Sequence, residues 1–395
     1  MLLYFLFMLT KVLLLPLITF LVYALSNKGE GSHWNYFILT ADAFLHGHLN
    51  ILNPPSWLNE LVFWKEFYYS VFPPMPAILL MPFVALFGIN FYQPILSWLL
   101  GAFSVLLSYM VFCKVFNEKV AFWTSILYAF GTIQWFHAQV GSAWYLAHIT
   151  SLFFLWLFLW EAFTKHRLII LGFFLGCAYL SRLPTIFALI FILVYFSKDF
   201  FSFHRFRIEI NWKNALLFLF GLIPFLLINA LYNYLRYGVI SDIGYTLLPI
   251  FNEPWYKFGF LNINYVPIHL AEIFTAMPII IGIFPYIIPS MFAMAIWFTT
   301  PAFILMIFAR FRTKIAIASI LTIIAIAIPS LLHGGNGFSQ FGYRHTLDYM
   351  PFLLLLTASG MRDMVKWWTK LLIFLSILIN FWGVIMISHL NKWGI

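Results

Sequence analysis

The sequence predicts an all-α protein that crosses a membrane about eleven times. Hydrophobic residues make up 63% of the chain and charged residues only 9%, and the mean hydropathy is +0.93. Several apolar runs approach or exceed the roughly 20 residues that a helix needs to cross a bilayer, and a soluble core could not bury so much apolar surface. Most lysines and arginines lie in short loops between these runs, as they do on the cytoplasmic side of membrane proteins.

The apolar runs are the candidate membrane segments. They occur at about 2–25, 74–89, 93–113, 120–138, 143–163, 168–198, 214–234, 287–309, 315–332, 346–361 and 370–389. Two of them do not fit a single crossing. The run 74–89 is short and rich in proline, whereas the run 168–198 is too long and has Arg182 and Pro184 in its middle.

The positions of the basic residues resolve both runs, because short basic loops stay on the cytoplasmic side. If 74–89 dips into the outer leaflet without crossing, and 168–198 folds as a helical hairpin near Pro184, every basic loop falls on one side. These loops hold Lys114, Lys119, Lys165, Arg167, Lys198, Arg205, Arg207, Lys213, Arg310, Arg312, Lys314, Arg362, Lys366 and Lys370. If 74–89 crossed instead, the loops at 114–119 and 164–167 would lie outside, against the rule.

The resulting topology is a single integral membrane domain, residues 1–395, with its amino terminus inside. Two long external regions are expected, at 26–92 and 235–286, and no soluble carboxy-terminal domain. The segment 36–47 reads as an amphipathic helix that lies along the membrane surface. The basic loops are explained by anchoring beside anionic lipid, so nucleic acid is not expected as a partner.

Most carboxylates face outward in this topology, so any chemistry is expected on the outer side. The outward acids are Glu30, Asp42, Glu60, Glu66, Asp242, Glu253, Glu272 and Asp348. Glu30 is the first of them, and Gly29 and Gly31 on either side allow a ligand to approach the backbone closely. A carboxylate here can remove the proton from an attacking hydroxyl. The alternative is a solvated loop acid, and Asp42 and Glu60 are the second choices for the base.

Four cations are expected at the outer level. Arg182 lies at the tip of the membrane hairpin, where an arginine is costly unless it meets an anion or water. Arg344 follows a glycine-rich loop, Arg236 ends an apolar run, and Lys65 lies in the first external region. Together they fit a clamp for the phosphate of a lipid head group. The alternative for each is to reach the membrane surface or to pair with a local acid.

No metal or cofactor is required by the sequence. His33, His46 and His48 form a weak pattern for a metal site, and Cys113 and Cys177 lack metal-ligand spacing. A divalent metal is therefore the less favoured alternative. The nucleotide-binding pattern GxxxxGK[ST] is absent from the sequence, which argues against coupling to a soluble nucleotide.

A resemblance to a known family rests on several short motifs. They are ADAFLHG (41–47), LNEL (58–61), FYYSVFPPMPAILLMPFVALFG (67–88), AYLSRLPT (178–185), YNYLRYG (232–238), TTPA (299–302) and GFSQFGYRHTLDYMPFLLLL (337–356). Through these the chain resembles a bacterial branch of the GT-C glycosyltransferases. The branch is related to the protein O-mannosyltransferases and to the enzyme that transfers aminoarabinose to lipid A.

The resemblance implies a GT-C-like fold with membrane-lying helices in the first external loop, and a catalytic carboxylate soon after the first span. Glu30 matches that carboxylate by position. The family's commoner residue there is aspartate, which leaves Asp42 and Glu60 open as alternatives. A lysine precedes the paired prolines in the lipid A branch, but here Phe72 precedes Pro73, so the phosphate clamp must use other cations.

The function expected on these grounds is sugar transfer from a polyprenyl-phosphate donor to a lipid, polysaccharide or protein acceptor, with inversion at the sugar carbon. It would take place at the outer face of the bacterial cytoplasmic membrane. Five residues are expected to line the substrate path or to anchor at the interface: His33, Trp57, Trp64, Tyr69 and Tyr343. The alternatives are a flippase or transporter of a lipid-linked sugar, which needs the same cations but no base, and a non-catalytic scaffold.

Overall fold

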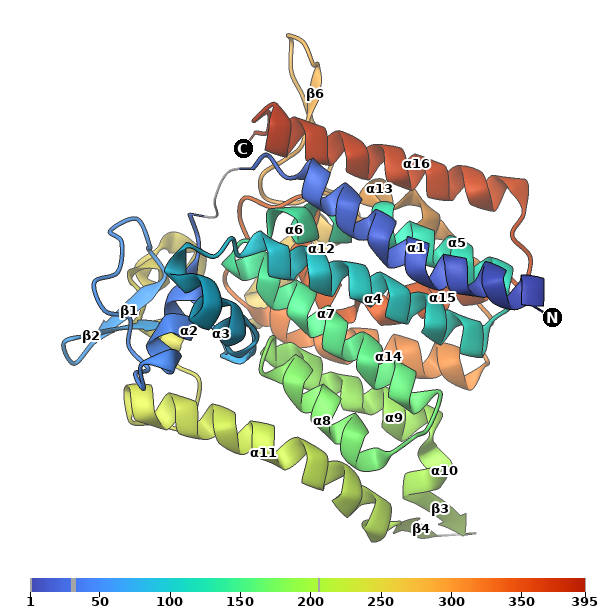
Figure 1. Ribbon diagram of the computed structural model, residues 1–395, viewed down its shortest axis with the longest axis horizontal. Coiled ribbons are helices and arrows are strands. Elements are labelled where there is room, and N and C mark those ends of the chain that lie inside the picture. Colours follow the sequence, from blue (N-terminus) through green and yellow to red (C-terminus); the bar gives the residue numbers. More distant parts are fainter. Residues whose placement is uncertain (1, 30–32, 205–206, 395) are drawn as a thin grey trace.

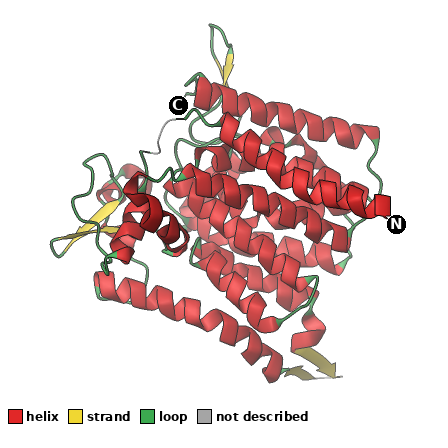
Figure 2. Cartoon of the chain, viewed as in Figure 1, coloured by secondary structure: helices red, strands yellow, loops and turns green. Residues whose placement is uncertain are grey.

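Apolar helices lie side by side in the computed structural model, which describes residues 2–29, 33–204 and 207–394 (Figure 1). Strands are limited, within these residues, to three two-stranded antiparallel ladders (Figure 2). Five helices are long and apolar enough to cross a membrane: α4 (Pro94–Val115), α7 (Ala143–Ala162), α11 (Trp212–Tyr237), α14 (Lys314–Leu332) and α16 (Trp367–Val384), which continues as a π-helical turn, η9 (Ile385–His389). The expected all-α membrane fold is therefore confirmed, and the number of about eleven crossings stays a prediction.

Burial separates the inner helices from the outer ones. In the apolar stretches of α7 and α4, 78% and 67% of the residues are buried, against 33% in α11, α14 and α16. The outer helices therefore expose apolar side chains where lipid would lie. Further helices complete the bundle: α1 (Leu2–Ser26), which has 25 residues, and the shorter α5 (Glu118–Phe130), α6 (Gln134–Val140), α8 (Leu168–Tyr179), α9 (Leu189–Tyr195) and α15 (Met350–Gly360).

Two runs that the sequence presents as continuous are broken. The run 120–138 divides between α5 and α6 at Gly131, where an added Cβ would collide with Leu127 and Ser376. The run 287–309 holds only two short pieces, α13 (Ile296–Thr299) and a 3-10 helix, η7 (Pro301–Phe308). Pro301 lacks the N–H that would continue α13.

The expected hairpin within 168–198 is present. Helix α8 ends at Tyr179, and the chain turns through Ser181 and Arg182 into a 3-10 helix, η2 (Leu183–Ala188), that leads to α9. Pro184 lies in the first turn of η2, where its missing N–H costs nothing. Arg182 is therefore held at the tip of the hairpin.

The short proline-rich run forms α3 (Met75–Phe87), which packs on α2 (Tyr36–Leu45). Both helices, with the hairpin of β1 (Leu61–Trp64) and β2 (Phe67–Ser70), lie at one end of the bundle (Figure 1). With 13 residues, α3 is shorter than the roughly 20 residues of a crossing helix. Its length agrees with a segment that does not cross.

The basic loops meet at the opposite end of the bundle (Figure 1). The side chain of Asn117 donates to the carbonyl of Asp363, and Arg310 pairs with the Asp363 carboxylate at 3.0 Å. Nearby, β3 (Phe201–His204) and β4 (Arg207–Ile210) form a ladder after the turn α10 (Ser197–Phe200). The loops rich in lysine and arginine therefore lie at the end of the bundle opposite to α2 and α3.

The segment after α11 caps the end that carries α2 and α3. Its elements are η3 (Gly244–Leu247), η4 (Pro249–Asn252), η5 (Pro254–Tyr256), η6 (Ile263–Tyr265), α12 (Val266–Phe274), β5 (Ile279–Ile280) and β6 (Ile287–Ile288). The chain reaches this end again at η8 (Arg344–Tyr349), directly before α15.

Glycines bring α8 and α11 into backbone contact. An added Cβ at Gly221 would overlap the carbonyl of Ile169, and one at Gly172 would overlap the carbonyl of Phe218. Small residues at such positions let membrane helices approach closely. We expect Gly221→Ala to lower the thermal unfolding temperature in detergent, because overpacking costs about 1–3 kcal/mol.

Gly282→Ala is the matched control, because no atom lies within 4 Å of a Cβ at that position. Equal unfolding temperatures for the two variants would contradict the proposed helix contact.

Candidate active site

An ion pair joins the hairpin tip to the start of α15. Arg182 Nη2 lies 3.0 Å from Asp348 Oδ2, and Arg182 Nε lies 3.2 Å from Oδ1. The Asp348 side chain is fully buried, whereas 24% of the Arg182 side chain is exposed. The guanidinium therefore binds the carboxylate through two nitrogens and keeps part of its surface open.

Two histidines flank this ion pair. His148 Nδ1, on α7, lies 2.7 Å from Asp348 Oδ1, and His345 Nδ1 lies 3.3 Å from Arg182 Nη2. Since Arg182 donates to His345 Nδ1, the neutral imidazole of His345 carries its proton on Nε2. The Nε2 atoms of both histidines are buried and have no protein partner among the described residues. We call Arg182, Asp348, His148, His345 and Arg344 the arginine site.

Arg344 is the second guanidinium of this site and follows the glycine-rich loop 334–342. Its backbone N–H donates to Gln340 Oε1 at 3.2 Å, and its Nη1 donates to the carbonyl of Phe338 at 3.3 Å. Within the described part of the chain, no carboxylate lies at ion-pair distance from Arg344. Arg344 is therefore a partly buried cation whose carboxylate partner, if it has one within the protein, is not among the described residues.

Glu60 is a carboxylate within electrostatic reach of Arg344. It accepts a hydrogen bond from Trp144 Nε1 at 2.8 Å, and its backbone N–H donates to the hydroxyl of Tyr36 at 3.0 Å. Burial raises the pKa of Glu60, while the bond from Trp144 and the positive charge of Arg344 oppose the rise. The tryptophan ring also packs on Tyr36 and Phe72, which explains the apolar surroundings of the carboxyl.

Tyr245 is a buried phenol that is influenced by Glu60 and by both arginines. Burial raises the pKa of its phenol, the negative charge of Glu60 adds to the rise, and the charges of Arg182 and Arg344 oppose it. All three charged groups therefore lie within electrostatic reach of one hydroxyl. They come from three separate segments: the first external region, the hairpin tip and η8.

A second polar layer supports the glycine-rich loop. His269 Nε2 lies 2.8 Å from the carbonyl of His333, and His269 Nδ1 lies 2.8 Å from the hydroxyl of Tyr343. Burial lowers the pKa of His269, so the imidazole is neutral, donates to His333 and accepts from Tyr343. Asn336 donates to Glu272 Oε1, while Oε2 of Glu272 is buried without a partner in the described chain.

The predicted base Glu30 lies outside the described residues, so its role stays a prediction. Asp42 is on α2 with a side chain 39% exposed, and its Oδ1 lies 3.5 Å from His46 Nδ1. Of the two predicted carboxylates that the structure describes, Glu60 is the one within electrostatic reach of Arg344.

The other two predicted clamp residues lie apart from Arg182 and Arg344. Arg236 donates to the carbonyls of Ser70 and Tyr232 and to Asn233 Oδ1, and its guanidinium carbon lies 3.6 Å from the centre of the Tyr232 ring. These contacts favour a structural role, in which Arg236 joins α11 to the end of β2. Lys65 is exposed at the β1–β2 turn. Phosphate contacts by either residue stay a prediction.

The residues predicted to line the substrate path lie in different parts of the structure. The ring of Tyr343 lies 5.2 Å from that of His345, beside the arginine site. Tyr69 is buried against Tyr237, at 5.9 Å between ring centres. His33 and Trp57 contact each other through the bond from Trp57 Nε1 to the His33 carbonyl. The indole N–H of Trp64 is buried without a partner in the described chain.

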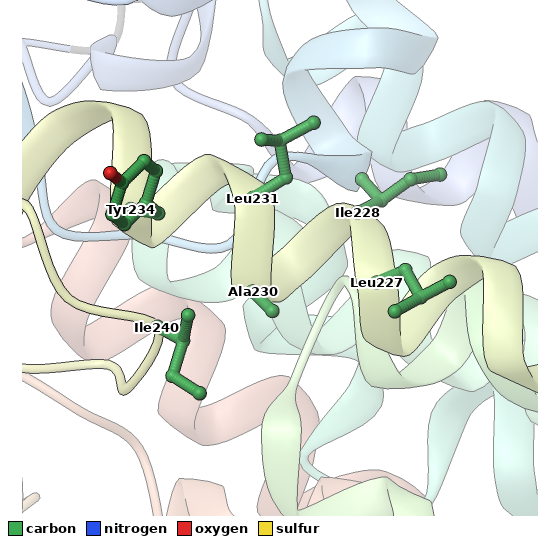
Figure 3. Close-up of a pocket in the computed structure, with 6 residues that line it drawn as sticks. All are labelled: Leu227, Ile228, Ala230, Leu231, Tyr234 and Ile240. Atoms are coloured by element: carbon green, nitrogen blue, oxygen red, sulfur yellow. The ribbon is translucent and has the colours of Figure 1, made fainter.

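A separate shallow groove lies on the outer face of α11 (Figure 3). It is lined by Leu227, Ile228, Ala230, Leu231, Tyr234 and Ile240. These side chains are almost entirely apolar, as expected for a surface that contacts lipid. The groove carries no group for chemistry, so the arginine site is the candidate active site.

The fold agrees with solved glycosyltransferase structures. The chain has the GT-C fold. ArnT from Cupriavidus metallidurans, an aminoarabinose lipid A transferase, superposes on 90% of the chain with a TM-score of 0.53 and 15% identity in the apo state. The same protein bound to undecaprenyl phosphate matches 93% of the chain with the same score.

An archaeal GT-C enzyme gives a similar match. The oligosaccharyltransferase of Archaeoglobus fulgidus covers 96% of the chain in its apo form, with a TM-score of 0.51 and 12% identity. The chain spans 60% of the length of apo ArnT and 55% of that of the oligosaccharyltransferase. No protein-family model and no curated sequence matches the chain. The likeness is thus one of fold.

Sequence reasoning missed the inner partners of the arginine site. Asp348 was counted among the outward acids without a role, although it follows Arg344 and His345 in one short segment. His148 lies inside the apolar run 143–163, and an ionisable residue in such a run is a reason to expect function. The contacts of these residues with Arg182 join positions far apart in the chain.

We expect Asp348→Asn to lower the thermal unfolding temperature strongly, because it leaves Arg182 partly buried without a counter-ion. Breaking a buried pair in this way costs about 3–5 kcal/mol. The double variant Arg182→Gln/Asp348→Asn should regain part of the loss, since neither charge then remains. Equal loss in the single and double variants, measured by thermal unfolding in detergent, would argue against the pair.

Glu272 predicts a pH-dependent stability. Burial raises its pKa from the ordinary value of 4.5 to about 7, against the hydrogen bond from Asn336. Between these pH values the folded protein holds a proton that the unfolded chain has lost, so stability falls as pH rises from about 4.5 to about 7. Glu272→Gln should flatten this part of the unfolding-temperature profile. An unchanged slope in the variant would show that another group titrates.

Proposed function

We propose that the chain transfers a sugar from a polyprenyl-phosphate donor to an acceptor, with inversion at the sugar carbon. The observation that carries this proposal is the pair of partly buried guanidinium groups, Arg182 and Arg344, beside the Glu60 carboxylate. A phosphate fits between two such forks, because guanidinium binds phosphate oxygens in a planar, bidentate geometry. A polyprenyl-phosphate donor is proposed because the structurally similar GT-C enzymes use lipid-linked phosphates.

The solved relatives support a lipid phosphate as the ligand. One ArnT structure holds undecaprenyl phosphate, and one structure of the archaeal oligosaccharyltransferase AglB holds a dolichol-phosphate and an inhibitory peptide. Both lipids combine an anionic head with an isoprenoid chain. In the present chain, Arg344 has no carboxylate partner among the described residues, which leaves it available for such a head group.

The proposed reaction needs one base and one anion clamp. The acceptor hydroxyl oxygen attacks the sugar carbon from the face opposite the phosphate, and the bond between that carbon and the phosphate oxygen breaks. The hydroxyl proton passes to a carboxylate, and the electron pair stays on the leaving phosphate. Arg182 and Arg344 stabilise the charge of the phosphate in a site of low water content.

Two carboxylates are candidates for the base. Glu30 has the position in the sequence that the family resemblance implies, and Glu60 has the surroundings that a base requires. Burial raises its pKa, which increases its basicity, while Arg344 and Trp144 help to keep it ionised. Asp42 is the weaker alternative, because its side chain is 39% exposed and its partner is His46.

The clamp is tested by Arg344→Gln and Arg344→Lys in purified protein supplied with radiolabelled polyprenyl-phosphate sugars. We expect the glutamine variant to lose about 10²- to 10³-fold in turnover, as when one oxyanion-binding donor is removed. Lysine should restore part of it as a point charge. Lys257→Gln removes an exposed cation of the second external region and serves as the control. Normal turnover of Arg344→Gln would exclude this residue from the clamp.

The base is identified by comparing Glu30→Gln with Glu60→Gln. The variant that removes the base should lower transfer by about 10²- to 10⁴-fold while folding normally. Glu66→Gln, at the exposed β1–β2 turn, is the control for loss of one external carboxylate. Near-normal transfer by both glutamine variants would exclude both residues as the base.

The purified protein and the labelled donor also distinguish a sugar transferase from a lipid transporter. In proteoliposomes, a labelled sugar covalently attached to an acceptor supports the transferase. Movement of the intact donor between leaflets without transfer would support a flippase and overturn the proposal. We place the reaction at the outer face of the bacterial cytoplasmic membrane, as the positions of the basic loops suggest.

A further inference from the structure

The hairpin of β5 and β6 is an unusual feature, because its tip is apolar and exposed. The strands pair Ile279 with Ile288 and Ile280 with Ile287. Ile280, Ile283 and Phe284 have exposed fractions of 82%, 70% and 77%. Figure 1 shows the hairpin projecting beyond the bundle, roughly across the direction of the helices.

The base of the hairpin lies at the level where α16 ends. The backbone N–H of Met291 donates to the carbonyl of Gly394 at 2.8 Å, and the N–H of Gly394 donates to that of Pro289 at 3.0 Å. At this end, His389 Nε2 also lies 2.9 Å from the carbonyl of Ser26, the last residue of α1. The backbone N–H of Gln340 donates to the carbonyl of Met291 at 3.2 Å, and Gln340 Oε1 accepts from the N–H of Arg344. The hairpin therefore leaves the bundle at the end that carries the arginine site.

The composition of the hairpin indicates its partner. No Asp, Glu, Lys, Arg or His occurs in the sequence between Glu272 and Arg310. A protein interface surrounds its apolar centre with a polar rim, which this tip lacks. Aliphatic and aromatic side chains without charge match a lipid surface, and Tyr286 supplies a ring of the kind found at the membrane boundary.

The backbone limits how deeply the hairpin can lie. A two-stranded ladder leaves the outer N–H and C=O groups of each strand unpaired, and such groups are not tolerated in the hydrocarbon core. They are tolerated in the boundary between head groups and acyl chains, about 5–10 Å deep. We propose that the β5–β6 hairpin inserts into this boundary, in the leaflet on the side of the arginine site.

A fluorescent label at Phe284→Cys tests the proposal. Cys113 and Cys177 are first replaced by alanine, so that an environment-sensitive dye attaches at one position only. The labelled protein is reconstituted in phosphatidylcholine vesicles that carry a nitroxide either near the head group or near the end of the acyl chain. We expect blue-shifted emission that is quenched more strongly by the shallow nitroxide.

The matched control is Glu66→Cys, at the tip of the other external hairpin, where the turn is charged. Its dye should emit as in water and resist both nitroxides. Emission of the dye at position 284 as in water would overturn the proposal. So would a blue shift without quenching, which would show a protein partner, or stronger quenching by the deep nitroxide. Unchanged thermal unfolding of both labelled variants shows that the fold is intact.

Discussion

The ion pair between Arg182 and Asp348 is the interaction on which the candidate site depends. A guanidinium at the tip of a membrane hairpin and a fully buried carboxylate are each costly alone, and each makes the other tolerable. Their contact holds the α8–α9 hairpin against η8. His148, on α7, also contacts Asp348, so α7 is held at the same carboxylate. Three elements far apart in the chain therefore meet at one carboxylate.

The contacts of Arg182 are confined to one edge of its guanidinium, and 24% of its side chain is exposed. Asp348 occupies Nε and Nη2 of Arg182, and the described residues offer no partner to Nη1. Arg344, which begins η8, is brought to the same region by the segment that carries Asp348. Asp348 neutralises the charge of Arg182, so the positive charge of Arg344 can attract an anion. In the proposed reaction this anion is the phosphate of the lipid donor.

Polar contacts support the residues around the arginine site. The glycine-rich loop before Arg344 is held from behind by Tyr145, which donates to the Ser339 carbonyl, and by Gln340, which donates to the Phe292 carbonyl. On the facing side, Trp144 and Tyr36 hold Glu60 through its carboxylate and its backbone N–H. Since Trp144 and His148 both lie on α7, one inner helix contacts both Glu60 and the Asp348 partner of Arg182.

The sequence by itself determined the class of fold, the hairpin at Pro184, the short α3 and the separation of basic loops from the outer region. These features depend on local hydrophobicity, proline chemistry and charge, which can be read from neighbouring residues. It also identified Arg182, Arg344 and Glu60 as candidates. The partners Asp348, His148 and His345, the structural contacts of Arg236 and the breaks at Gly131 and Pro301 were decided by the tertiary structure. Each of these features depends on packing between segments that are distant in the chain. A local sequence pattern cannot predict which buried charged residues will contact each other.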